Sequence, residues 1–318
     1  MASGNELTKA YAAKAKDPQI LQMSASGGMF TVLSDLFLNN GDAVVGCIFH
    51  VQTKTAQLQL ITDKDQRDRA RSSKYMQSQT GTVYQDSIRW LRENPDGKLL
   101  FTGLGCQAAA FRKITDRMGF SDRVLIVDII CHGVPSGKLW KEYITDIEKK
   151  YKTSLQSVNF RDKRTGWAQS QAIATFADRE INMKDFMRVY FDNLIIRPSC
   201  YCCPYATVSR NSDITVGDFW HIEKVMPDFV DPRGNSLVLI QTEKGHAYFN
   251  EISDQIDFCP CDITQCLQIN LQHPTEKPAQ REAFWRDYTR RGIGYVIEKY
   301  GHITFFKRVK RKLRKLFS

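Results

Sequence analysis

The chain has 318 residues, 42% of them apolar, so it can bury a substantial core as one large domain or two. Its mean hydropathy is −0.39, and it has no apolar run of about 18 residues, which excludes a transmembrane helix. Seven of its ten net positive charges fall in residues 307–318, and the +3 left over is too small to indicate a nucleic-acid-binding face.

The first half of the chain predicts alternating strands and helices. The expected strands are 43–49, 98–102 and 124–130, and the expected helices are 29–38, 81–92, 107–114 and 137–150. This order is typical of βαβ units. It predicts an α/β fold with a mostly parallel sheet flanked by helices.

Two segments in this half are candidate binding loops. Residues 24–28 (Ser-Ala-Ser-Gly-Gly) precede a helix, where backbone N–H groups can approach a phosphate, although Ser26 also suits a plain helix cap. Residues 71–75 (Arg-Ser-Ser-Lys-Tyr) place hydroxyl, ammonium and phenol groups next to one another in the sequence. Such a set suits an anionic or aromatic cofactor, but it is also typical of a solvated loop.

Cys106 and Cys131 each follow one of the central strands. If those strands are parallel, both thiols emerge at the carboxyl edge of the sheet, where open α/β sheets bind ligands. The alternative is that both are small buried apolar residues, as free cysteine often is. His132 follows Cys131, but neighbours in a strand point to opposite faces, so metal ligation is favoured over thiol–imidazole catalysis.

After about residue 154 the pattern changes to a mixed α+β half that carries a cysteine loop. Strands 155–160 and 171–176 are expected to pair antiparallel, followed by a helix near 183–192 and strands 213–218 and 236–241. Three cations surround the Gly-Trp turn in residues 161–167, either as a grip for an acidic substrate or as an exposed turn. We therefore predict that the chain divides into an N-terminal α/β part at 1–152, a C-terminal part with the cysteine loop at 153–300, and a basic amphipathic tail at 301–318.

The cysteine loop supplies Cys200 and Cys203. Structural zinc sites usually combine two such pairs, whereas four thiolates from three segments are what an iron–sulfur cluster requires. The spacing favours a cubane and leaves zinc open. The other cysteines are interpreted as follows: Cys202 as a spare, Cys47 as core, and Cys259, Cys261 and Cys266 as structural.

The last residues have a helical period. Apolar residues recur at three- and four-residue steps through 305–317, with basic residues between them. Such a helix suits an anionic membrane surface, or it packs back on the protein. The polar start and nine unevenly spaced cysteines predict a reduced, cytosolic setting.

Taken in order, these segments resemble the family of beta subunits of deazaflavin (coenzyme F-420) hydrogenases and dehydrogenases, which includes plant hydroxymethyl-chlorophyll reductase. The resemblance spans about residues 10–250. It rests on the following segments: 24–28, 73–75, 102–107, 131–136, 200–203 and 212–220. It implies FAD, a [4Fe–4S] cluster, and electron or hydride transfer between them and a substrate.

The resemblance also implies roles for individual residues. The implied cluster ligands are Cys106, Cys131, Cys200 and Cys203. The implied flavin site, in residues 1–152, draws on Ser24, Ser26, Gly27, Gly28, Ser73, Lys74, Tyr75, Thr102 and Gly103. Lys74 is expected to stabilise the reduced flavin anion, and His132 and Asp218 are the expected proton donors.

Two departures from the family pattern matter. No cysteine precedes Cys47, so the amino-terminal ferredoxin-like module of longer relatives is not expected, and a separate ferredoxin-like carrier would supply electrons. Gly105 stands where the family usually has proline. Shorter relatives with a basic tail resemble proteins associated with bacterial surface-polysaccharide synthesis, for which the deazaflavin is not the expected substrate.

We therefore expect a cytosolic iron–sulfur flavoprotein oxidoreductase that acts on a small organic molecule. Contact of residues 305–317 with the inner membrane face is an additional expectation, and no nucleic-acid partner is expected. The rival is a zinc-stabilised accessory protein that binds a membrane or glycosyltransferase partner and performs no redox step. A third interpretation is an electron-transfer subunit without its own substrate pocket.

Overall fold

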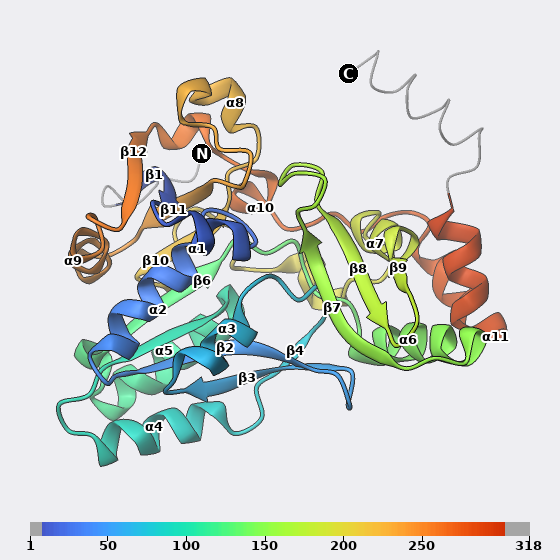
Figure 1. Ribbon diagram of the computed structural model, residues 1–318, viewed down its shortest axis with the longest axis horizontal. Helices are drawn as coiled ribbons and strands as arrows, with labels where there is room; N and C mark the ends of the chain where they lie inside the picture. Colours follow the sequence, from blue (N-terminus) through green and yellow to red (C-terminus); the bar gives the residue numbers. More distant parts are fainter. Residues whose placement is uncertain (1–7, 303–318) are drawn as a thin grey trace.

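The apolar runs of the first half form the centre of a nine-stranded sheet in the computed structural model, which describes residues 8–302 (Figure 1). In order across the sheet, the strands are β12 (Ile256–Cys261), β1 (Lys9–Ala15), β11 (Ser236–Ile240), β10 (Ile214–Asp218), β6 (Val124–Ile129), β5 (Leu99–Leu104), β2 (Ala43–His50), β3 (Thr55–Ile61) and β4 (Ser78–Gln79). The neighbours β10, β6, β5 and β2 run parallel, which confirms the predicted parallel core. The strands β11, β1 and β12 extend it antiparallel.

Helices cover both faces of this sheet because apolar residues alternate along its strands. In β5, Leu100 packs on the face covered by α2 (Met29–Asn39), α3 (Lys64–Ala70) and α9 (Glu243–Glu251). Its neighbours Leu99 and Phe101 pack on the opposite face, against α4 (Val83–Glu93) and α5 (Gly105–Met118). The fold is therefore the α/β class that the sequence predicts.

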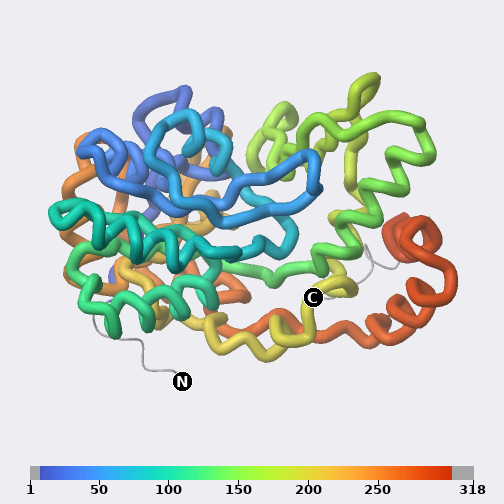
Figure 2. The backbone as a smooth tube through the Cα atoms, turned by 90° about the horizontal axis from the view of Figure 1, so that it is seen from below, coloured from blue at the N-terminus to red at the C-terminus, as the bar shows by residue number. Residues whose placement is uncertain are grey.

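A second, antiparallel sheet lies beside the first. It consists of β7 (Leu155–Asp162), β8 (Gln171–Phe176) and β9 (Glu180–Asn182). These strands share a core with α6 (Gly137–Tyr151), α7 (Lys184–Phe191) and α11 (Arg281–Val296). Figure 2 shows α11, in red, on the far side of this unit from the large sheet. The predicted antiparallel pair of strands 155–160 and 171–176 is confirmed.

Short elements complete the described chain. They are α1 (Pro18–Met23), α8 (Ile222–Val225), α10 (Ile269–Gln272), the 3-10 turns Ser121–Arg123, Pro198–Cys202, Pro227–Phe229 and Ile263–Gln265, and a final π-helical turn at Ile297–Gly301. No helix in residues 8–302 is long and apolar enough to span a bilayer. The tail segment 305–317, predicted to contact a membrane, lies outside the described residues.

The strands β10, β11 and β12 follow residue 152, yet they belong to the same sheet as β5 and β6. β10 pairs parallel with β6, which puts the second half of the chain at the centre of the sheet. The boundary predicted near residue 152 therefore divides the chain but not this sheet.

Candidate functional site

Strands β5 and β6 present two cysteines at equivalent positions on one sheet edge. The last pair in their parallel register is Leu104 with Ile129, so Cys106 and Cys131 each stand two residues past it. The Gln107 side chain accepts a hydrogen bond from the Leu104 N–H (3.0 Å), and helix α5 begins at Gly105, two residues earlier than predicted. Cys106 therefore lies in the first turn of a helix.

The chain that follows β6 packs on the segment that precedes the cysteine loop. The Arg197 N–H donates to the Val134 carbonyl (3.0 Å), and Pro135 and Ile196 form a β-bridge. Gly133 has a φ of +126°, and a Cβ there would stand 2.6 Å from the Ile196 side chain. This close approach requires glycine and brings Cys131 next to the loop that carries Cys200 and Cys203.

A buried ion pair fastens the other side of the cysteine loop. The Arg210 guanidinium lies 2.7 Å from the Asp128 carboxylate at the end of β6, and the two side chains are only 2% and 1% exposed. Arg210 also donates to the carbonyl of Tyr205, two residues after Cys203. The second Asp128 oxygen accepts hydrogen bonds from Ser212 (2.9 Å) and Thr215 (2.6 Å). The loop is thus tied to the same sheet edge as Cys131.

The four predicted ligand thiols lie within electrostatic reach of one another. Burial, together with the smaller effects of the neighbouring Cys200, Cys106 and Cys203, raises the pKa of Cys131 to about 12. Burial also raises the pKa of Cys106, and the neighbouring Cys203 and Cys200 contribute smaller increases. Cys202 is exposed and contacts a carbonyl of its own turn instead.

No group of three or more Cys, His, Asp or Glu side chains in residues 8–302 surrounds a single point as a metal site would. In a cubane, however, each thiolate binds a different iron, so the ligands need not meet at one point. Backbone N–H groups of Gln107 and Gly133 favour the ionised forms of Cys106 and Cys131. This donor set fits an iron–sulfur cluster, and its ligand role stays a prediction.

A second constellation forms around Asp218 at the end of β10. Its carboxylate accepts hydrogen bonds from Arg161 (3.0 Å) and from the Trp167 indole (3.0 Å). Burial raises the pKa of Asp218, while Arg161 opposes this shift. The Ser26 hydroxyl donates to the Asn235 carbonyl (2.7 Å) and lies beside this carboxylate.

Tyr75 joins the same constellation. Burial raises the pKa of its phenol, which hydrogen-bonds Arg161 and Ser73. The predicted segments 24–28 and 73–75 therefore meet at Asp218. Arg161 and Trp167, at the two ends of the turn at 161–167, are only 8% and 6% exposed, whereas Arg164 and Thr165 in its middle are exposed. The charge-rich Gly-Trp pattern was the available sequence signal for the two buried residues.

The small residues at 24–28 are explained by close packing. A Cβ on Gly27 would stand 2.4 Å from the Ala13 carbonyl and 2.7 Å from the Ser236 nitrogen. Helix α2 begins after Gly28, which is its N-cap with a φ of +86° and no side-chain cap. Ser26 is therefore not the cap, because its hydroxyl is used on Asn235. The Ser24 hydroxyl donates to the Ile20 carbonyl (2.7 Å).

Gly27→Ala is expected to lower the free energy of unfolding by about 1–3 kcal/mol, because two strand backbones block the added methyl group. Urea titration measures this change. Gly137→Ala is the matched control, since a Cβ there meets nothing within 4 Å at the start of α6 and is expected to be neutral or slightly stabilising. Equal stability of the two variants would contradict the prediction.

Lys74 closes the carboxyl end of α3. Its ammonium donates to the carbonyls of Ala70 (2.8 Å), Arg71 (2.7 Å) and Ser72 (3.1 Å). Burial lowers the pKa of Lys74 to about 8, and Cys47 opposes this shift. The structural role is thus a helix cap, which the sequence did not reveal, and the predicted role beside a flavin stays a prediction.

The lowered pKa of Lys74 predicts a pH-dependent contribution to stability. Unfolded chains keep this proton up to the ordinary value of 10.5, whereas the native chain releases it near 8. Between these values the unfolded state binds more protons, so stability rises with pH. The unfolding free energy of the native chain, minus that of Lys74→Met, is expected to grow by roughly 2.5 kcal/mol from about pH 7 to pH 10. A difference that stays flat in urea titrations would show that Lys74 keeps its charge.

Thr102 and Gly103 make structural contacts at the end of β5. The Thr102 hydroxyl donates to the Val45 carbonyl of β2 (2.6 Å). A Cβ on Gly103 would stand 3.2 Å from the Gln107 side chain, whose amide donates to Ser78 (2.9 Å). Both residues lie at the cysteine edge, and their contact with a flavin stays a prediction.

A row of rings links the two constellations. The His132 ring lies 5.3 Å from that of Tyr190, which lies 5.3 Å from that of Tyr75. Burial raises the pKa of the Tyr190 phenol most, and the neighbouring Cys131, Tyr75 and Cys200 contribute smaller increases. His132 Nε2 pairs with Asn193 Oδ1 (2.7 Å), and burial lowers its pKa, which favours the neutral imidazole.

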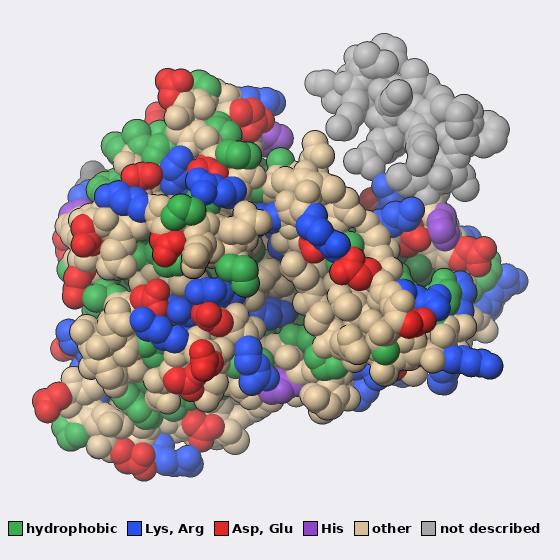
Figure 3. Space-filling model, viewed as in Figure 1, with side chains coloured by type: hydrophobic (Ala, Val, Ile, Leu, Met, Phe, Trp, Pro, Cys, Tyr) green, Lys and Arg blue, Asp and Glu red, His purple; other side chains and the backbone are tan. Residues whose placement is uncertain are grey.

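A cavity of about 680 Å³ opens beside Tyr75 and Arg161. Its volume lies within the range of small-molecule sites. Aromatic residues line it together with Arg161, Lys184, Arg188 and a single acid, Asp192. In Figure 3, basic side chains gather near the centre of the face where the two sheets adjoin.

Two buried polar atoms have no hydrogen-bond partner: Arg161 Nε, from a residue that lines this cavity, and Ser72 Oγ, three residues before the cavity-lining Tyr75. Ser72 also has a φ of +69°, a strained conformation that often marks ligand-binding loops. Buried donors without acceptors are costly, so these atoms fit a ligand that supplies acceptors. An acceptor-rich flavin satisfies that requirement.

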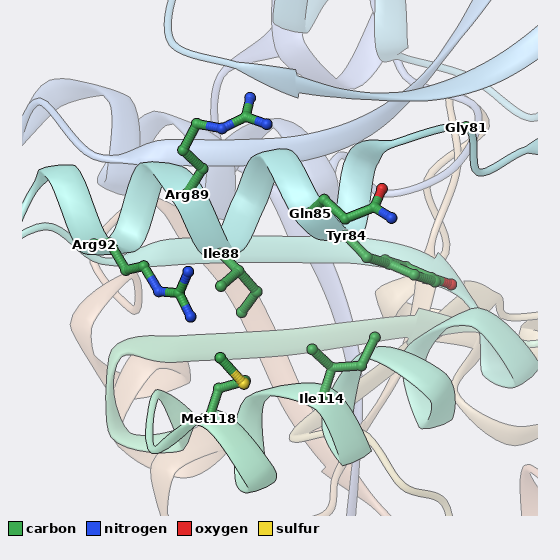
Figure 4. Close-up of a pocket in the computed structure, with 8 residues that line it drawn as sticks. All are labelled: Gly81, Tyr84, Gln85, Ile88, Arg89, Arg92, Ile114 and Met118. Carbon is green, nitrogen blue, oxygen red and sulfur yellow. The ribbon is translucent and has the colours of Figure 1, made fainter.

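A smaller cavity of about 500 Å³ lies between α4 and α5. Figure 4 shows Ile88, Ile114 and Met118 facing one another across the gap, with Arg92 beside them. At its inner end the Tyr84 hydroxyl donates to the Gln107 carbonyl (3.3 Å). Apart from Gln85, Arg89 and Arg92, this lining is mainly apolar, and it contains no acidic residue.

Free thiols at one edge of an α/β sheet, beside a buried polar and aromatic site, are typical of metal- or redox-active proteins. The chain matches the family described as coenzyme F420 hydrogenase/dehydrogenase, beta subunit, with its C-terminal model over residues 96–264 and its N-terminal model over residues 10–84. The chain belongs to this family of oxidoreductase subunits, which confirms the resemblance of its motifs.

Two relatives illustrate the match. One of the subunits of the F(420)H(2) dehydrogenase of Methanosarcina mazei is 26% identical over 260 residues, which is 78% of this chain and 64% of that protein. The chain thus spans less than two thirds of this relative's length. A chain of the F420-reducing [NiFe] hydrogenase complex from Methanosarcina barkeri has the same fold, with a TM-score of 0.51 and 17% identity, over 98% of this chain and 93% of that one.

Proposed function

We propose that this protein is an iron–sulfur flavoprotein oxidoreductase that passes electrons between a [4Fe–4S] cluster, FAD and an organic substrate. The observation that carries the proposal is the position of Tyr190. Its pKa is shifted both by the thiols of Cys131 and Cys200 and by Tyr75 of the polar constellation. A cluster held by those thiols and a flavin beside Tyr75 would lie one aromatic ring apart, which suits electron transfer.

The cluster ligands are Cys106, Cys131, Cys200 and Cys203, drawn from three chain segments. Gly133 supports this ligand set in two ways. Its backbone N–H hydrogen-bonds the Cys131 sulfur, and the absence of a Cβ lets the segment at Ile196 pack closely against it. The N–H groups in the first turn of α5 act in the same way on Cys106.

The FAD site lies where residues 24–28, 72–75 and 161 meet. Arg71 Nε donates to Thr31 in the first turn of α2 (3.1 Å), so a guanidinium and a helix N-terminus stand together, as a pyrophosphate requires. Arg161 Nε and Ser72 Oγ supply unpaired donors for ring acceptors. When bound, FAD supplies the exchange between one-electron and two-electron transfer.

Two residues of the chain are placed to handle protons. His132 is a neutral imidazole held by Asn193, so Nε2 or Nδ1 can carry the proton. Arg161 and Trp167 hydrogen-bond the Asp218 side chain and orient it beside Ser26, while burial raises its pKa and so favours the protonated form. We assign proton delivery to these two side chains because both adjoin the row of rings.

The substrate is a small anionic molecule that enters the 680 Å³ cavity, where three cations face one acid. Lys184→Gln with Arg188→Gln is expected to raise KM about tenfold or more for such a substrate and to leave iron and flavin content unchanged. Lys224→Gln with Arg290→Gln removes the same charge at exposed positions and is expected to have no effect. Equal KM values for the two double variants would overturn this assignment.

The wider role follows from the resemblance and is part of the proposal. The protein works in the cytosol with a separate ferredoxin-like electron carrier, in surface-polysaccharide metabolism, and the tail at 305–317 contacts the inner face of the membrane. These expectations rest on the motifs and on the basic, amphipathic pattern of the tail.

Anaerobic purification followed by iron, zinc and flavin assays and an optical spectrum tests the proposal. We expect about four irons and bound FAD per chain, with broad absorption near 400 nm. One zinc without flavin would instead support the accessory protein. Iron and flavin without turnover of any small molecule would support the electron-transfer subunit.

A further inference from the structure

Strand β12 carries a second group of thiols on its inner face. Cys259 and Cys261 pair with Ala12 and Ala10 of β1. Because they stand two residues apart in the edge strand, their side chains lie on the same face of it. Cys266 follows the 3-10 turn Ile263–Gln265 and is 4% exposed. Cys261 packs against the apolar cluster that contains Cys266.

Cys261 and Cys266 adjoin the same apolar cluster, on either side of the 3-10 turn, and the Cys266 thiol donates to the Ile263 carbonyl of that turn (3.4 Å). The two thiols are close enough to affect each other's titration, since Cys266 raises the pKa of Cys261 and Cys261 lowers that of Cys266. Cys259 is not part of this cluster, although it stands on the same strand face. Two of the three thiols are therefore neighbours across a short turn.

Residues 266–275, here called the strap, connect this thiol pair to the candidate site. Gln268 donates to the Asp218 carbonyl (2.5 Å). The Asn270 side chain hydrogen-bonds the His132 ring, and the Thr275 hydroxyl donates to the His132 carbonyl (2.5 Å). The strap thus contacts both residues that adjoin the row of rings, and Cys266 is its first residue.

We propose that Cys261 and Cys266 form a reversible disulfide that fixes the start of the strap. Two thiols lose two protons and two electrons as the S–S bond forms, and one molecule of an organic disulfide such as oxidised glutathione is reduced to two thiols. Cys261 is half-buried and accessible to such an oxidant, whereas Cys266 is buried beside it. The pairing rests on these contacts and is independent of the cluster and the flavin.

Peptide mapping tests the pairing in the full-length protein. The chain is treated with oxidised glutathione, alkylated, and cut before aspartate, which separates peptide 257–261 from peptide 262–286. We expect these two peptides to be joined in the wild type and in Cys259→Ser, and separate in Cys261→Ser. A bond within peptide 257–261, a bond to another cysteine, or two fully alkylated peptides would overturn the proposal.

Hydrogen exchange tests the effect on the strap. Oxidation of the wild type is expected to slow backbone exchange in residues 262–275, and reduction with dithiothreitol is expected to restore it. Cys266→Ser is expected to show no change under the same treatment, whereas Cys259→Ser behaves as the wild type. Exchange that is equal in the oxidised and reduced wild type would overturn the link between the disulfide and the strap, whatever the iron or flavin content.

Discussion

Cys203→Ser is expected to lose nearly all bound iron and the absorption near 400 nm, whereas Cys202→Ser is expected to keep both. Cys203 lies among the thiols that shift the pKa of Cys131 and Cys106, while its neighbour Cys202 is exposed and contacts its own turn. A serine hydroxyl does not replace a thiolate on iron under ordinary conditions. Iron assay and the anaerobic spectrum measure the change.

The adjacent control separates ligation from folding. Both substitutions fall in the same short turn, so a damaged loop would affect them alike, and circular dichroism checks that both variants are folded. Cys131→Ser is expected to behave as Cys203→Ser does. Full iron content in Cys203→Ser, or equal losses in the two loop variants, would remove Cys203 from the ligand set.

Asp128→Ala is expected to lower the free energy of unfolding by about 3–5 kcal/mol, because it leaves the buried Arg210 guanidinium without its carboxylate. It also removes the acceptor for Ser212 and Thr215. Arg210 fixes the chain next to Cys203, so iron is expected to dissociate faster from this variant. Urea denaturation and iron release to a chelator measure the two effects.

Two controls identify the cause. Asp128→Leu combined with Arg210→Met removes both charges and is expected to recover much of the lost stability, since no unpaired charge remains. Asp86→Ala breaks the exposed pair with Arg89 and is expected to cost less than about 1 kcal/mol. A cost for Asp128→Ala no larger than that for Asp86→Ala would contradict the role of the buried pair.

Local patterns were enough to predict the central elements. Strand 124–130 and helix 137–150 have strong periodicity, and the structure reproduces them within one residue at each end as β6 and α6. Helix α5 begins earlier than predicted because the Gln107 side chain caps Leu104, an interaction that hydrophobic periodicity does not record. Gly105 is also explained only in three dimensions, since a Cβ there would stand 2.6 Å from Arg210.

The sequence was less informative about the polar constellation. Ser26, Tyr75 and Asp218 were named from motifs, but nothing in their spacing showed that Arg161 and Trp167 would join them. Those contacts connect residues 51 to 57 positions apart, across two sheets. Lys74 was given a cofactor role, and its capping of α3 appears only once the chain has turned back on itself.

The order of apolar runs by itself determined the α/β class and the parallel core, and the ordered motifs carried the resemblance to the family. Periodicity encodes the class and the core because side-chain burial repeats every two or every 3.6 residues. Only the tertiary structure decided which thiols and charges are neighbours. The register of β5 with β6, the Arg210–Asp128 pair and the shared cluster of Cys261 and Cys266 arise from packing between segments far apart in the chain or across a turn, which no local pattern specifies.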